Sequence, residues 1–202
     1  MMYASVDGQR RLAWHGGRAT CPSCAGELIA KCGLIRIEHW AHQTEADCDA
    51  WSEPESEWHL GWKKHAEADR TEVVIERDGV KHRADILCVN SAILELQASP
   101  IAPAEIQARE SFYKYMAWLF QVTWAERLHY GKKGFWWKRG ALSQTFITKP
   151  LFWDYVEEGI VQEVKLARVE GNNGGDRVVG RAVKTYKREQ FAEFIATGKL
   201  SS

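Results

Sequence analysis

Two segments that follow each other closely in the chain carry side chains suited to binding a divalent cation. Residues 82–89 are expected to form a strand and contain Asp85. Residues 92–98 are expected to form the next strand and contain Glu95 and Gln97. Side chains alternate between the two faces of a strand, so Glu95 and Gln97 share one face. If Asp85 lies opposite them on an adjacent strand, the three supply hard oxygen ligands for Mg²⁺ or Mn²⁺ beside a phosphate.

The surroundings of Glu95 strengthen this interpretation. The rest of its segment is apolar, with Ile93, Leu94 and Leu96. A carboxylate in such a run is costly to bury unless something pairs with it. The alternative is an ordinary sheet in which Asp85 forms a salt bridge with Lys81 or Arg83.

A second group of chemically active residues lies near the amino terminus. Cys21 and Cys24 form a Cys-x-x-Cys pair, the spacing that places two thiolates on one tetrahedral zinc ion. His39 and His42 complete the set, and Cys48 is an alternative ligand because His-x-x-His is tighter than the common spacing between zinc-binding histidines. Four protein ligands would make the zinc structural rather than catalytic. The alternative is that the cysteines are free thiols and the histidines lie on the surface.

The composition sets bounds on the class of protein. The chain has 202 residues, enough for one compact domain with a small appendage. Its 27 basic and 27 acidic residues balance, so contacts with nucleic acid would have to come from local basic patches. No signal peptide and no apolar run of membrane-spanning length are apparent. A Cys-x-x-Cys pair among five cysteines then favours metal binding in a reducing, cytoplasmic compartment, without a membrane partner.

Periodicity and turn signals indicate the elements that must position these residues. A loop-rich zinc module is expected over residues 1–50, beginning with a hairpin at Asp7-Gly8, a mixed α/β core over 51–145, and a β-rich extension over 146–202. In the core we expect a helix, three strands, a helix and a strand, over residues 55–69, 71–76, 82–89, 92–98, 104–115 and 118–124. In the extension we expect two strands and a short helix, over residues 159–169, 177–185 and 188–196.

Taken together, these features resemble the competence protein CoiA-like family of predicted nucleases. The resemblance covers about residues 20–125 and depends on the order and spacing of several short motifs. These are Cys21-Pro22-Ser23-Cys24, His39-Trp40-Ala41-His42, Glu55-Ser56-x-x-His59-x-x-x-Lys63, Arg83-Ala84-Asp85-Ile86, Leu94-Glu95-Leu96-Gln97-x-Ser99 and Arg109-x-x-x-Tyr113. The family looks like a zinc-binding module fused to a PD-(D/E)XK, restriction-endonuclease-like core, whose αβββαβ order agrees with the elements expected above.

The resemblance implies a catalytic role for five residues. Asp85 matches the metal-binding aspartate of the motif and Glu95 its second acidic position, so the two would hold Mg²⁺. Gln97 falls where many such nucleases have lysine, and an amide can orient water but carries no charge. Lys63, on the preceding helix, would supply the missing cation if its side chain reaches the site. Glu55 resembles the additional acidic residue of RecB-like nucleases, although an acid at the start of a helix also favours the helix dipole.

Nucleic-acid contacts are expected at two places. Arg109-x-x-x-Tyr113 resembles the Gln-x-x-x-Tyr element of RecB-like nucleases and would contact the phosphate backbone, together with His59. The second place is a basic and aromatic stretch whose rings could stack unpaired bases; it includes Lys132, Lys133, Trp136, Lys138 and Arg139. In the alternative, His59 and Lys63 form a solvated helix face, Tyr113 belongs to the core, and the stretch combines core packing with a solvated loop.

The function expected from these residues is metal-dependent hydrolysis of DNA, with single-stranded or branched DNA favoured. The pathway would be DNA processing in recombination, uptake or mobile-element conflict, with a homodimer or a recombination or defence protein as further partners. The alternative is a catalytically degenerate nucleic-acid-binding module, favoured by the glutamine at position 97. A third hypothesis is a zinc-stapled adaptor for protein interaction, favoured by the neutral overall charge.

Overall fold

The computed structural model describes residues 1–33, 37–44, 48–51, 55–123, 146–170 and 176–199. Helices and strands are combined in these residues, so the expectation of a mixed α and β protein is confirmed at that level. The chain divides into two compact units, Met1–Leu87 and Cys88–Ser202.

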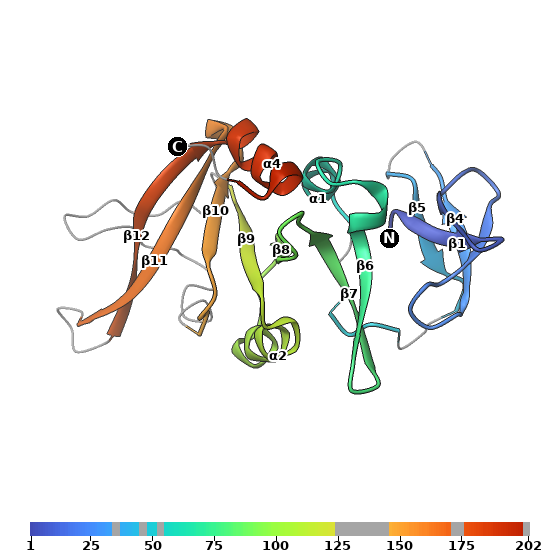
Figure 1. The fold of residues 1–202 in the computed structure, drawn as a ribbon, viewed down its shortest axis with the longest axis horizontal. Coiled ribbons are helices and arrows are strands. Elements are labelled where there is room, and N and C mark those ends of the chain that lie inside the picture. The colour runs from blue at the N-terminus through green and yellow to red at the C-terminus, as the bar shows by residue number, and fades with distance from the viewer. Residues whose placement is uncertain (34–36, 45–47, 52–54, 124–145, 171–175, 200–202) are drawn as a thin grey trace. The chain divides into compact units, whose positions relative to one another are not determined.

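The first unit begins with a five-stranded antiparallel sheet, drawn in blue in Figure 1. Its strands are β1 (Tyr3–Val6), β2 (Gln9–Leu12), β3 (Arg18–Thr20), β4 (Glu27–Lys31) and β5 (His39–His42), in the spatial order β2-β1-β3-β4-β5. The predicted Asp7-Gly8 turn joins β1 to β2, and both of its residues have the positive φ that such a tight hairpin needs. One face buries a small core around Trp40 and Leu28. The last three strands were not predicted.

A short helix, α1 (Glu57–Lys63), follows the sheet. The hydroxyl of Ser56 caps it by accepting a hydrogen bond from the backbone N–H of His59. The sequence predicted a helix as far as residue 69, and this was wrong by about a turn and a half. After Lys63 the backbone tightens, because His65 and Ala66 donate to carbonyls three residues back, and the hydroxyl of Thr71 then bonds the Lys63 carbonyl at 3.3 Å.

An antiparallel hairpin completes the first unit. Its strands are β6 (Thr71–Arg77) and β7 (Val80–Leu87), joined at the predicted Asp78-Gly79 turn. In this register Thr71 pairs with Ile86 and Val73 with Ala84. Glu72 on β6 and Asp85 on β7 lie between these two pairs, where the ladder has no regular pair.

The second unit is a β-α-β crossover extended by three more strands. Strand β8 (Ile93–Gln97) pairs in parallel with β9 (Met116–Val122), and α2 (Pro103–Tyr113) connects them, as a parallel pair requires. Strand β10 (Leu151–Tyr155) adds in parallel to β9, and it was not predicted. The long hairpin of β11 (Ile160–Glu170) and β12 (Asp176–Lys187) closes the sheet on the β10 side. All five residues of β8 are buried, and so are all five of β10.

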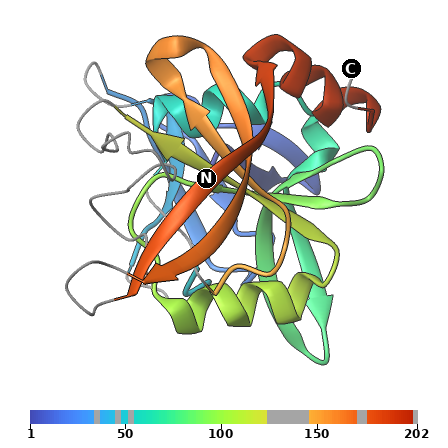
Figure 2. The same ribbon diagram turned by 90° about the vertical axis from the view of Figure 1, so that its left-hand side faces the viewer.

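Two helices lie toward opposite ends of the strands of this unit, as both views show (Figures 1 and 2). One is α2, and the other is α4 (Arg188–Thr197), which follows β12 directly and buries Phe191 and Ile195. The predicted closing helix is thereby confirmed. The N-terminal end of α2 carries Pro103 in its first turn, where proline is well tolerated.

Candidate functional site

Four metal-ligand side chains meet at one end of the N-terminal sheet. Cys21 follows β3, Cys24 lies in the turn that leads to β4, His42 ends β5, and Cys48 lies shortly after it. The ligand atoms of all four lie within 4.8 Å of one another. The Sγ atoms of Cys21 and Cys48 are 3.5 Å apart, and the Sγ of Cys24 is 3.3 Å from Nε2 of His42. This Cys₃His group can hold a metal ion.

These separations fit a tetrahedral zinc ion. Zn–S bonds of about 2.3 Å and Zn–N bonds of about 2.0–2.1 Å place two sulfur ligands about 3.8 Å apart and a sulfur and a nitrogen about 3.5 Å apart. The observed distances agree with these values to within a few tenths of an ångström. Of the two ligands that the sequence left open, Cys48 joins the group, whereas Nδ1 of His39 lies 2.7 Å from the carbonyl oxygen of Ile37.

The electrostatics of the thiols also suit a cation. Burial, followed by the neighbouring thiols of Cys21 and Cys24, raises the pKa of Cys48 to about 12. Burial also favours a raised pKa for Cys21, but hydrogen bonds from the backbone of Cys24 and Ser23 outweigh it and the pKa is lowered. Burial, with Arg83 contributing, lowers the pKa of His42, which keeps its ring neutral and able to ligate. A bound cation would offset the repulsion among thiolates.

A second cluster in the first unit surrounds the ammonium group of Lys63. Its Nζ lies 2.8 Å from Oε1 of Glu55, 3.1 Å from Oδ1 of Asp85 and 3.3 Å from Oε1 of Glu72. We call these four residues the acid–lysine cluster. The side chain of Asp85 is 20% exposed, whereas the other three are 8% exposed or less. Asp85 is therefore the member that solvent and a hydrated ion reach most readily.

Each member of the acid–lysine cluster comes from a different place in the chain. Glu55 lies just before the cap of α1, and Lys63 lies in its last turn, where a cation also favours the helix dipole. Glu72 lies on β6 and Asp85 on the neighbouring strand β7. The structure thus brings together three of the five predicted catalytic residues, Glu55, Lys63 and Asp85.

The charges of the cluster stabilise each other. Burial acts to lower the pKa of Lys63, but Asp85, Glu72 and Glu55 outweigh it and the pKa is raised. Burial acts to raise the pKa of Glu72, but Lys63 and Arg83 outweigh it and the pKa is lowered. For Glu55 burial dominates, and its pKa is raised. Lys63 therefore stays fully charged throughout the physiological pH range.

One alternative from the sequence is not supported here, and a second differs in the partner of its salt bridge. His59 and Lys63 do not form a solvated helix face, since both are 4% exposed, and His59 Nδ1 lies 2.7 Å from the hydroxyl of Ser56. The salt bridge of Asp85 is with Lys63, while Lys81 pairs with Glu76.

Glu72 is the residue that sequence reasoning missed. It follows Thr71 and precedes two valines in a segment read as an ordinary strand. A carboxylate within an apolar run is costly to bury unless it has a partner, and this pattern, which pointed to Glu95, is also present at Glu72.

In the second unit, Glu95 pairs with an arginine. Nη1 of Arg109 lies 2.7 Å from Oε2 of Glu95, and its Nε lies 3.0 Å from Oε1 of Glu105. The predicted phosphate-binding Arg109 is thus held by two carboxylates and is 3% exposed. Burial acts to lower the pKa of Arg109, but Glu95 and Glu105 raise it. Gln97, on the same strand as Glu95, donates from Nε2 to the carbonyl oxygen of Ser99.

Two further predictions concern Tyr113 and the basic, aromatic stretch. Tyr113 is buried at the end of α2, as expected if it belongs to the core. The basic and aromatic residues Lys132, Lys133, Trp136, Lys138 and Arg139 lie outside the described residues.

None of the helices in the described part of the chain is both long and apolar enough to cross a membrane.

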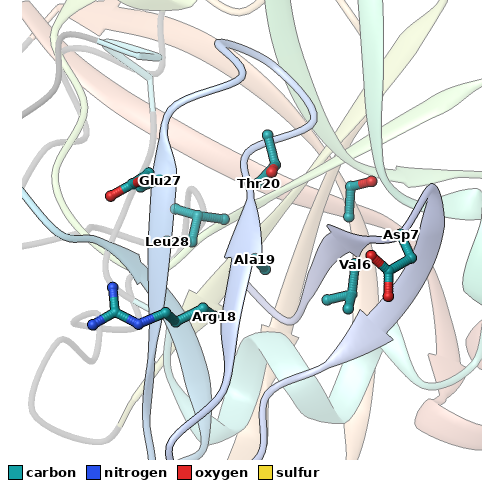
Figure 3. A pocket seen from close by; sticks show the side chains of 8 residues that line it. Val6, Asp7, Arg18, Ala19, Thr20, Glu27 and Leu28 are labelled. Carbon is teal, nitrogen blue, oxygen red and sulfur yellow. The ribbon is translucent and has the colours of Figure 1, made fainter.

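A shallow pocket of about 270 Å³ lies on the N-terminal sheet (Figure 3). Residues of β1, β3 and β4 and of the β1–β2 turn line it, among them Asp7, Arg18 and Glu27. Neither the Cys₃His group nor the acid–lysine cluster contributes to its lining. It therefore adds nothing to the chemistry of either.

Comparison with known proteins gives two matches. Residues 9–50 match the family model described as "Competence protein CoiA, N-terminal domain", and this range includes all four members of the Cys₃His group. The chain is 31% identical over 106 residues to a Bacillus subtilis protein named "Competence protein CoiA". The alignment covers 48% of this chain and 28% of that protein.

No solved structure gives a significant match. The two matches found agree with the resemblance recognised in the sequence motifs, and one of them contains the candidate metal centre. On this evidence the chain is similar to the CoiA-like family over part of its length, most clearly in the N-terminal segment that holds the Cys₃His group.

Proposed function

We propose that the chain is a metal-dependent nuclease that hydrolyses phosphodiester bonds in DNA, built on a restriction-endonuclease-like core. The observation that supports it most is the position of Lys63, whose ammonium lies 3.1 Å from Asp85. The sequence lacks a lysine at position 97, where many nucleases with this motif have one. Lys63 offers a positive charge from α1 in its place.

The proposal assigns a role to five residues. Asp85 in the first unit and Glu95 in the second are each a proposed ligand of Mg²⁺, since each supplies hard oxygen atoms. Mg²⁺ would lower the pKa of a bound water and stabilise charge on the attacked phosphate. Because its pKa is raised, Lys63 is a poor proton donor, so its role is to offset negative charge rather than to act as a general acid. Glu55 holds Lys63 in place, and Gln97 orients water.

The Cys₃His group has a separate role in this proposal. Four protein ligands fill a tetrahedral site and leave no open position for a substrate or a reactive water. We therefore assign zinc as its metal and give it a structural role. A segment of this size buries little apolar surface, so a metal adds stability that its small core cannot supply.

The family name points to competence as the biological setting. The chain spans 28% of the Bacillus subtilis relative, so the activity and partners of that whole protein are not carried over. We propose a role in processing DNA during uptake or recombination. Single-stranded and branched DNA are the proposed preferred substrates.

The test is DNA cleavage by the purified chain on single-stranded, duplex and branched substrates, with Mg²⁺, Mn²⁺ or EDTA. Asp85→Asn and Glu95→Gln are compared with Glu76→Gln, an exposed carboxylate on the same hairpin as Asp85. The proposal predicts metal-dependent cleavage that both site variants lose and the control keeps. Cleavage that survives both site substitutions contradicts it.

A second candidate function is a nucleic-acid-binding module without catalysis. The glutamine at position 97 favours it, and so does Arg109, whose charge is engaged by Glu95 and Glu105. It predicts metal-independent DNA binding that Asp85→Asn leaves intact, with no cleavage in any metal. A protein with neither binding nor cleavage would be the zinc-stapled adaptor instead.

A further inference from the structure

Glu72 connects the acid–lysine cluster to the first strand of the N-terminal sheet. Its Oε1 accepts a hydrogen bond from Nζ of Lys63 at 3.3 Å. Its Oε2 accepts two more, from the backbone N–H of Met2 at 2.8 Å and of Tyr3 at 3.0 Å. The side chain is 1% exposed, so water does not satisfy these groups. Both oxygens of the Glu72 carboxylate therefore accept hydrogen bonds, one from α1 and the other from the backbone at the start of β1.

The backbone at Glu72 is also unusual. Its φ is +52°, in the left-handed region that residues other than glycine rarely adopt. Such a conformation costs about 1–3 kcal/mol and persists only where the surroundings hold it. Nothing about an ordinary strand position requires it. The hydrogen bonds of the side chain to Lys63, Met2 and Tyr3 are the contacts that hold the residue in this conformation.

The charge arrangement links Glu72 to Asp85 through Lys63. The two carboxylates come from neighbouring strands, Glu72 from β6 and Asp85 from β7. Both are bonded to the same ammonium. Lys63 therefore lies between two carboxylates whose positions are set by the hairpin. Its location depends on both of them, and not on Asp85 alone.

We propose that Glu72 is a positioning residue, which holds Lys63 against Asp85 and ties the pair to strand β1 of the N-terminal sheet. This inference deepens the proposed nuclease function and shares its site. Glu72 does not bind metal in this role, because its oxygens are occupied by Lys63 and by two backbone N–H groups. Loosening β1 should then disturb Lys63.

Glutamine is the informative replacement, because it keeps the shape of Glu72 and removes its charge. Its single oxygen can still accept from the backbone of β1. Its NH₂ group would face the ammonium of Lys63, and a donor cannot accept a hydrogen bond from another donor. Aspartate keeps the charge but is one methylene shorter, so it cannot span the distance to both partners. Lys63 should therefore be displaced in Glu72→Gln.

The first readout is the ¹⁵N NMR signal of the Lys63 ammonium, assigned with Lys63→Arg. A buried, hydrogen-bonded ammonium exchanges its protons slowly, so the signal should be present in the wild type. We expect it to shift or disappear in Glu72→Gln and to persist in Glu76→Gln, the exposed control on the same strand. A signal that is the same in Glu72→Gln as in the wild type would overturn the proposal.

The second readout is cleavage kinetics. We expect Glu72→Gln to lower kcat by about tenfold or more with KM unchanged, since about 1.4 kcal/mol of lost stabilisation gives that factor. If the wild type does not cleave DNA, the nuclease proposal fails, while the ammonium signal still decides the role of Glu72. If Glu72→Gln does not fold, hydrogen exchange of the Tyr3 backbone amide is measured in the wild type instead. Fast exchange of that amide would contradict its hydrogen bond to Glu72.

Discussion

Replacing Lys63 with methionine tests whether its ammonium holds the acidic side chains of the first unit together. Methionine keeps a flexible stem of similar length and removes the charge. Lys63 is 4% exposed and lies within 3.3 Å of Glu55, Glu72 and Asp85. Removing one partner of a buried ion pair costs about 3–5 kcal/mol, and we expect a loss of unfolding free energy in this range.

The loss should depend on pH. In the wild type the pKa of Lys63 is raised, so its stabilising contribution is fully present below the ordinary lysine pKa and does not change between about pH 5.5 and 8. In Lys63→Met, burial without the cation should raise the pKa of Glu55 and Glu72. A carboxyl with a raised folded pKa destabilises above that pKa and not below its unfolded pKa. The deficit should therefore be larger at about pH 8 than at about pH 5.5.

Urea unfolding followed by circular dichroism at these two pH values measures the deficit. Lys81→Met is the matched control, because Lys81 forms an exposed ion pair with Glu76 on the same hairpin. Exposed pairs contribute about 0–1 kcal/mol, so the control should lose no more than that at either pH. A deficit in Lys63→Met that equals the control, or that is the same at both pH values, would show that Lys63 does not hold the carboxylates together.

Four other substitutions have defined outcomes. Cys48→Ser should lower zinc affinity by at least about tenfold and His39→Ala should leave it nearly unchanged, as measured by competition with a chromogenic chelator; the reverse order would contradict the Cys₃His assignment. Asp49→Ala should also weaken zinc retention, because Asp49 holds the Cys48 segment to the backbone of Arg83 at 2.8 Å; unchanged affinity would show that this tie is not needed. Arg109→Met should cost about 3–5 kcal/mol in urea unfolding by leaving Glu95 buried without its cation, and a cost below about 1 kcal/mol would contradict that pairing.

Local signals in the sequence predicted much of the fold. The Asp7-Gly8 and Asp78-Gly79 turns were predicted because each needs positive φ at both central positions, which few residue pairs supply. Strand β10 was missed, since all five of its residues are buried and the run shows no alternation of apolar and polar side chains. The early end of α1 was missed because the Thr71 hydroxyl that bonds the Lys63 carbonyl comes from outside the helix.

The candidate site was likewise predicted only in part. The Cys-x-x-Cys spacing predicted two ligands, but the choice between His39 and Cys48 depends on where the chain goes after β5, which spacing does not define. Similarly, the i, i+4 relation of His59 and Lys63 could be read from the sequence, but the burial of their side chains could not. The contacts of Lys63 with Glu72 and Asp85 depend on β6 and β7, which come later in the chain. Glu72 was overlooked because its partners at positions 2, 3 and 63 are far from it in sequence.

The central claim, a metal-dependent nuclease that uses Asp85 and Lys63, is tested most directly by single-turnover DNA cleavage in Mg²⁺. The wild type is compared with Asp85→Asn and Lys63→Met, and Glu76→Gln serves as the control. We expect cleavage by the wild type and the control, abolished by EDTA. We also expect a loss of about a hundredfold or more in folded samples of each site variant. Equal cleavage by Asp85→Asn and the wild type would rule out this nuclease site.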